Sequence, residues 1–220
     1  MAQDWQGFLV WLFDGAADPT GGPAEMPLND LDFLTGATEP ALPAQRPLER
    51  RASKHLRRRE AEAFAMQALI DMARQQPLHW LRDPRLPDID GEATWLLLQL
   101  VVALPRPSAD TIGEHGPLSQ LLERALQSPE LPMALAAVRA AEWTAMRGLQ
   151  ATVAGRFHRN LTRLDAESRT SYLDCLQAIG DGRCVRPLEA LLADCGTLLD
   201  DHQAWRTRHI VQVIRRAGRK

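Results

Sequence analysis

The sequence is poor in the residues on which β-rich proteins depend. Aromatic residues make up 5% of the 220 residues, and Tyr172 is the single tyrosine. Strands of sandwiches and barrels draw on tyrosine, phenylalanine, valine and threonine, usually in alternating apolar and polar order. No alternating run of useful length is present, whereas the 45% of hydrophobic and 25% of charged residues are ordinary for a globular protein. We therefore expect an all-α fold.

Long apolar runs and a disulfide framework are also missing. The longest apolar stretch, residues 5–13, is too short to cross a bilayer and lacks the basic flank of a secretory signal. The cysteines are odd in number, and Cys175, Cys184 and Cys195 each lie on or beside an apolar stripe. We expect small buried thiols rather than disulfides or metal ligands. The sequence thus predicts a cytoplasmic protein without a membrane span.

Motifs that fix a reaction are absent as well. There is no glycine-rich nucleotide loop and no HExxH, GxSxG or CxxC motif. His202 and His209 share a helical face, but two imidazoles without a third ligand do not predict zinc. Asp88, Asp90 and Glu92 are too closely spaced for a calcium loop, and we interpret them as helix-capping groups. We therefore predict no enzyme activity, no cofactor and no metal.

Acidic residues are concentrated at the start of the chain. The net charge is −2, yet residues 1–45 hold seven acids and no lysine or arginine. The same segment is rich in proline and glycine, which disfavours a long helix or a central strand. It still carries apolar clusters at 5–13 and 28–34. We interpret residues 1–47 as an irregular acidic arm that docks on its own helical body, the alternative being a docking peptide for another protein.

Basic residues gather in two clusters. Seven of them, opposed by Glu49, lie within residues 46–59, and a second group crowds residues 206–220. Such clusters can contact a phosphate backbone. However, only Lys54 and Lys220 of the 26 basic residues are lysines, which we treat as a bacterial-type bias of composition. A solvated face, or a face neutralised by the acidic arm, is the favoured interpretation.

Apolar spacing becomes helical after Pro47. A run from 53 to 75 contains neither glycine nor proline, and the blocks that follow are bounded by such breaks. Ser128 before Pro129, and Asp165, are expected to start helices. We predict one helical domain over 48–220. Its further helical blocks are 92–104, 117–127, 131–148, 149–161, 165–179, a helix capped by Asp181, and 203–217, whose apolar stripe is Ile210, Val213, Ile214 and Ala217.

The most specific pattern lies near the C-terminus. Gly180 ends one helix, Asp181 caps the next, and Pro187-Leu188 precedes the pair Leu191-Leu192. This string resembles the HEAT-like repeat of the phycobilisome-lyase type. Pro187 is expected about two turns inside the cap, where it should cost a backbone hydrogen bond and bend the helix. The resemblance implies an α-α superhelix, which is a short HEAT-like solenoid.

A weaker copy supports this interpretation. Pro117-Leu118 also precedes a leucine pair, 70 residues before Pro187-Leu188, which is twice a 35-residue period. The copy between them would centre near residue 152, where no Pro-Leu occurs. A helical bundle without repeats is the alternative.

Helical repeat proteins bind partners over a long surface, so we predict a non-catalytic protein-binding scaffold or adaptor. The alternative is a nucleic-acid-binding HEAT-like protein, including a DNA glycosylase-like enzyme. Such an enzyme would need tryptophan platforms and a catalytic aspartate in a cationic groove, and no residue motif of that family is matched here. The predicted partner-binding residues are Trp5, Phe8, Trp11, Arg50, Arg51, Arg57, Arg58, Arg183, Arg186 and Arg206.

Overall fold

The computed structural model describes residues 5, 8, 9, 12, 13, 66–89, 91–107, 112, 113 and 115–218. Regular structure in this part of the chain is helical throughout, without a strand, which confirms the all-α prediction there. The chain divides into two compact units, Met1–Gln76 and Pro77–Lys220. The predicted boundary at residue 47 lies outside the described residues.

The first unit contains two described helical stretches. Residues 66–74 are helical, in agreement with the prediction for that part of 53–75. Near the N-terminus, residues 5, 8, 9, 12 and 13 are helical, and Trp5, Leu12 and Phe13 are buried.

The second unit is built from α-helices joined by short 3₁₀ turns. Its predicted helical blocks are all present, and the block 117–127 has the predicted bounds. The described helices are α4 (Gly91–Ala103), α6 (Pro117–Gln127), α7 (Leu131–Thr144), α8 (Gln150–Asn160), α9 (Ala166–Ile179), α10 (Val185–Cys195) and α11 (Asp201–Ala217). The 3₁₀ turns are η3 (Leu78–Arg82), η4 (Leu86–Asp88), η5 (Arg147–Leu149), η6 (Leu161–Arg163), η7 (Gly182–Cys184) and η8 (Gly196–Leu198).

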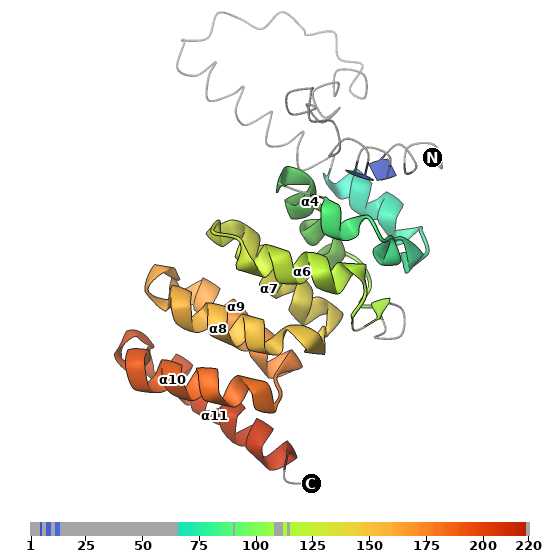
Figure 1. The fold of residues 1–220 in the computed structure, drawn as a ribbon. Helices are drawn as coiled ribbons and strands as arrows, with labels where there is room; N and C mark the ends of the chain where they lie inside the picture. The colour runs from blue at the N-terminus through green and yellow to red at the C-terminus, as the bar shows by residue number, and fades with distance from the viewer. Residues whose placement is uncertain are drawn as a thin grey trace, which may run out of the picture. The chain divides into compact units, whose positions relative to one another are not determined.

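Alternate helices of the second unit form two layers (Figure 1). In one layer α4 contacts α7, α7 contacts α9, and α9 contacts α11, while in the other α6 contacts α8 and α8 contacts α10. Contacts between the layers join α6 to α7, α8 to α9, and α10 to α11. Each helix of the two layers buries an apolar stripe in these contacts.

Helix starts and buried positions recur at a spacing of 35 residues in one layer. α7, α9 and α11 begin at Leu131, Ala166 and Asp201. The side chains of Asp165 and Asp200 cap α9 and α11 by accepting the N–H of the residue three positions on, at 2.8 and 2.7 Å. The recurring buried residues are Ala137, Tyr172 and Thr207; Ala140, Cys175 and Ile210; Ala141, Leu176 and Val211; and Thr144, Ile179 and Ile214.

The start of α7 differs from the prediction. Ser128 does not cap it. The helix begins at Leu131 after Glu130, with Pro132 in its first turn. Ser128 instead accepts the N–H of Glu130 through its hydroxyl oxygen, at 3.2 Å. Pro129 restricts Ser128 to an extended conformation. Pro132 is tolerated in the first turn of α7 because a backbone N–H at that position would have no intrahelical acceptor.

The junction between α9 and α10 confirms two predictions and corrects one. Gly180 ends α9, and an added Cβ there would clash with the Leu176 carbonyl and lie 3.0 Å from Ile214 Cδ1. Asp181 caps η7, which continues directly into α10. Pro187 is consequently the third residue of α10, in its first turn. The predicted loss of a hydrogen bond there is wrong, because first-turn N–H groups have no intrahelical acceptor.

The predicted stripe of the last helix is partly wrong. Ile210 and Ile214 are buried as expected, but Val213 and Ala217 are exposed. Adjacent residues lie 100° apart around a helix, so the buried face that includes Ile210 and Ile214 turns Val213 to solvent. Gln203, Ala204, Thr207 and Val211 complete the buried face, which a search for apolar residues misses because two of these four are polar.

Asp181 is expected to contribute measurably to stability. Its carboxylate accepts the N–H of Arg183 at 2.8 Å and the side-chain amide of Gln150, at the start of α8, at 2.6 Å. Asp181→Ala should therefore lower the free energy of unfolding by about 0.5–2 kcal/mol in urea denaturation. Asp181→Asn, which keeps an acceptor oxygen, should lose less. An alanine variant as stable as the wild type would show that the cap contributes nothing.

Candidate interaction surface

One side of α11 presents an aromatic and apolar row to solvent. We define the α11 outer face as His202, Trp205, His209, Val213 and Arg216, all exposed. The indole of Trp205 is 57% exposed and stacks between two imidazoles, with ring centroids 6.3 Å away for His202 and 5.2 Å for His209. Stacking holds the three rings in a row, which pre-organises an apolar surface for contact.

Apolar exposure is concentrated at this end of the second unit. In the described part of the chain, the exposed large hydrophobic residues are Trp95, Leu198, Trp205 and Val213. Trp95 is on α4, whereas Leu198 precedes α11 and the other two lie on it. Exposed apolar groups that cluster, rather than scatter singly, mark surfaces of interaction. The α11 outer face, which contains Trp205 and Val213, is such a cluster.

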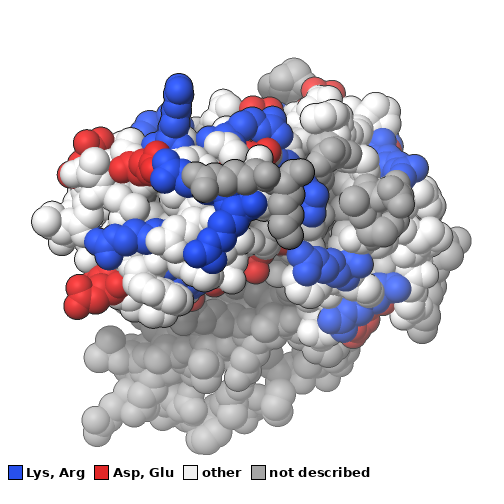
Figure 2. Space-filling model, turned by 90° about the horizontal axis from the view of Figure 1, so that it is seen from below, with Lys and Arg blue, Asp and Glu red and all other residues white. Residues whose placement is uncertain are grey.

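Basic side chains are frequent at this end of the second unit (Figure 2). The view from the α10–α11 end shows basic side chains spread over the face, with acidic side chains interspersed. Arg215 pairs with Glu189. Arg208 and Arg216 are exposed and have no ion pair within the described residues. Arg208, one turn from Trp205, and Arg216, three turns along the same helix, are thus available to an incoming partner.

A polar network lies on the layer formed by α7, α9 and α11. Arg206 donates to Asp174 at 2.7 Å and to the side-chain oxygen of Gln177 at 2.9 Å. Glu142 of α7 belongs to the same region, since burial raises its pKa above the ordinary value and the charge of Asp174 raises it further. Arg206 therefore ties α11 to α9.

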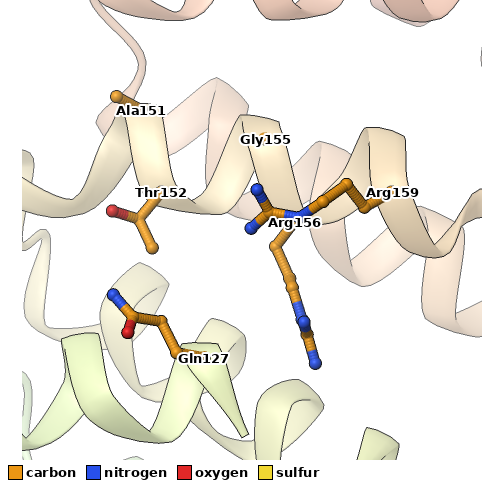
Figure 3. Close-up of a pocket in the computed structure, with 6 residues that line it drawn as sticks. All are labelled: Gln127, Ala151, Thr152, Gly155, Arg156 and Arg159. Carbon is orange, nitrogen blue, oxygen red and sulfur yellow. The ribbon is translucent and has the colours of Figure 1, made fainter. Parts of the chain in front are cut away.

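A shallow hollow of about 600 Å³ lies between the end of α6 and one face of α8 (Figure 3). In this view Gln127 and Thr152 face each other, Arg159 lies back along α8, and Arg156 reaches toward the end of α6. The guanidinium of Arg156 donates to the carbonyl oxygen of Ser128. The hollow is lined by Gln127, Ala151, Thr152, Gly155, Arg156 and Arg159, and hence by two arginines and no acid.

The cysteines form part of the core, as predicted for buried thiols. Cys175 and Cys184 are free and buried, and Cys195 is half-buried. Burial raises the pKa of Cys184 to about 11 and that of Cys175 further. Thiolates, not thiols, attack electrophiles and bind metals, so both groups are unreactive near neutral pH. No cluster of potential metal ligands occurs within the described ranges.

The predicted partner-binding residues that the structure describes differ in their surroundings. Trp5 is buried, and the half-buried ring of Phe8 lies 5.2 Å from it, so both would have to be uncovered before they could contact another protein. Arg183 and Arg186 are exposed at the start of α10, where Arg183 pairs with Asp181. Arg206 is held in the polar network. Trp11, Arg50, Arg51, Arg57 and Arg58 lie outside the described residues.

The tryptophans are also dispersed. Trp80 is buried, and Trp143 is half-buried and donates its indole N–H to the carbonyl of Leu104 at 2.9 Å. The exposed Trp95 and Trp205 lie on α4 and α11, which α7 and α9 separate. They do not make one platform. The spacing of His202, Trp205 and His209 could have revealed the α11 row, because residues three and four apart share a helix face.

No protein-family model matches this sequence, and neither a curated protein nor a solved structure is significantly similar to it. None of the helices in the described part of the chain is long and apolar enough to cross a membrane.

Proposed function

We propose that this chain is a non-catalytic protein-binding scaffold, a short HEAT-like solenoid whose α11 outer face receives a helix of a partner protein. The 35-residue spacing of α7, α9 and α11, with equivalent buried positions, supports the repeat interpretation. The two layers support it further, since solenoids stack helix pairs that contact their neighbours only.

The observation that carries the proposal is the position of the exposed aromatic row. At the position equivalent to His209, α7 and α9 each carry a side chain that pairs with the next helix, whereas Thr170 and Ala178, equivalent to Trp205 and Val213, are exposed on α9. Arg139 of α7 pairs with Glu167 of α9 at 3.3 Å, and Asp174 of α9 pairs with Arg206 of α11 at 2.7 Å. His209 follows Asp174 by 35 residues, yet no helix of the described chain covers it. A partner helix placed there would continue the layer.

Chemistry also indicates which partner would fit. Trp205 and Val213 need an apolar stripe opposite them, and Arg208 and Arg216 favour acidic residues at its margin. Burial of the apolar anchors supplies most of the affinity, while the charges orient the partner. An amphipathic helix with an acidic border therefore suits the α11 outer face.

Affinity capture tests the proposal. The full chain is used as bait in extract of the source cells, with nuclease treatment in parallel, and proteins crosslinked to it are identified by mass spectrometry. Trp205→Ser should abolish partner capture, while Trp95→Ser, a change at the other exposed tryptophan, should retain it. Both side chains are exposed, so thermal unfolding should be unaffected.

Other outcomes would contradict the proposal. Capture that survives Trp205→Ser would exclude the α11 outer face as the docking surface. Loss of all partners on nuclease treatment would favour nucleic-acid binding, the second candidate. That candidate draws on Arg208, one turn from Trp205 on α11, because single-stranded nucleic acids bind where bases stack on aromatic rings next to cations. Crosslinks to copies of the chain alone would indicate self-association instead.

A further inference from the structure

The hollow on α8 is formed where this helix departs from its neighbours in the layer. Moving 35 residues forward from α8 gives equivalent positions in α10, and moving 35 back gives those in α6. Val153 is buried like Leu118 and Leu188 at the equivalent positions, so the three helices share this part of their core. Where α8 has Thr152, the equivalent positions of α6 and α10 hold a proline, and where it has Gly155 they hold a larger residue. Arg156 is equivalent to Leu121 of α6 and Leu191 of α10.

Arg156 is the most unusual of these departures. Leu121 and Leu191 are fully buried, whereas Arg156 places a cation at the equivalent position and is half-buried. Its Nε is shielded from solvent and has no hydrogen-bond acceptor. Burying a charged donor without a partner is costly, and a leucine here would fit the layer. Residues that break a structural pattern in this way are often retained for binding.

The surroundings of Arg156 suit an anion. Its guanidinium is oriented by the Ser128 carbonyl, and the exposed Arg159 lines the same hollow without an ion pair in the described chain. Thr152 and Gln127 add neutral donors, while Gly155 leaves the space beside them free, with nothing within 4 Å of an added Cβ. The hollow thus carries two positive charges and no lining carboxylate, which favours an anion.

We propose that this hollow binds a phosphate group, held by Arg156 and Arg159 with Thr152 and Gln127 as additional donors. The guanidinium group of arginine can donate two parallel hydrogen bonds to two oxygens of one phosphate, which favours phosphate over a spherical anion such as chloride. The open mouth leaves room for the rest of a phosphorylated small molecule. This site is separate from the α11 outer face and does not depend on its function.

Calorimetric titration of the full chain tests the site at low ionic strength. The probes are inorganic phosphate and a nucleoside monophosphate, with sodium chloride at matched ionic strength as the reference. Arg159→Gln should weaken phosphate binding by about tenfold or more, because one charge-assisted contact is lost. Arg163→Gln, a change at an exposed arginine of η6 that does not line the hollow, should bind as the wild type does.

The variant Arg156→Leu distinguishes a role of Arg156 in phosphate binding from a role in stabilising the fold. It restores the residue found at the equivalent positions of α6 and α10, so it should fold with unchanged or higher thermal stability and lose phosphate binding. A purely structural Arg156 would instead lower the stability. The proposal is overturned if neither probe binds, or if both arginine variants bind phosphate like the wild type.

Discussion

Phe157→Ala should lower the free energy of unfolding by about 3–5 kcal/mol, a loss larger than that expected at most other positions. The ring is fully buried on α8 and stacks on Tyr172 of α9, with centroids 5.2 Å apart and planes tilted by 12°. It therefore joins the two layers of the second unit. Truncation removes the stacking contact and leaves a cavity, because helices held on several sides cannot collapse into it.

Guanidinium denaturation followed by far-ultraviolet circular dichroism measures this effect. Phe157→Leu is the matched control, since Leu122 and Leu192 occupy the equivalent positions 35 residues away in α6 and α10. It retains most of the volume and should lose less than about 1.5 kcal/mol. Equal stability of the alanine variant and the wild type would mean that α8 and α9 do not pack as described.

Leu188→Ala is the second substitution with a large expected effect, about 2–5 kcal/mol. Leu188 is fully buried on α10, which contacts both α8 and α11. The reference is Leu198→Ala in the turn before α11, where the side chain is 41% exposed and the change should stay within about 0.5 kcal/mol. Chemical denaturation of the two variants side by side gives the difference. If Leu188→Ala proved neutral, α10 would not bury this face.

Local signals predicted the helices well. Low aromatic content, helical apolar spacing and breaks at proline and glycine located the described helices, and Asp165 and Gly180 were recognised as start and end. Two of the errors concern helix starts. Ser128 and Pro187 each had two plausible relations to a nearby helix start: Ser128 accepts the N–H of Glu130 instead of capping α7, and Asp181 caps η7, so that α10 begins later than predicted. Such contacts depend on where the chain turns.

The repeat spacing was harder to recognise than the helices. Sequence similarity linked only the Pro-Leu starts near 117 and 187, because the equivalent core residues differ in size and polarity. One equivalent buried position holds Ala137, Tyr172 and Thr207. A core position requires a side chain that is buried and has a fitting volume, but not a particular residue type. The 35-residue spacing is therefore clear when buried positions are compared and faint when residue types are compared.

The candidate sites were predictable to different degrees. Arginine clusters and apolar segments drew attention to Arg206 and Trp5. In the structure, however, Arg206 is paired with Asp174 and Trp5 is buried. Trp205 belongs to the α11 outer face only because α9 and α10 take the opposite side of the helix. Arg156 and Arg159 form one hollow only because Gly155 leaves space between α8 and the end of α6.

The sequence by itself therefore determined the class of fold, the helical segments and the absence of known catalytic motifs, because composition, periodicity and capping act over a few residues. The tertiary structure alone decided which side chains are exposed, which arginines are paired and where aromatic rings line up. Those properties depend on residues tens of positions apart. Hydrophobic burial selects the helix faces that pack together, and the faces left over become the surfaces available for binding.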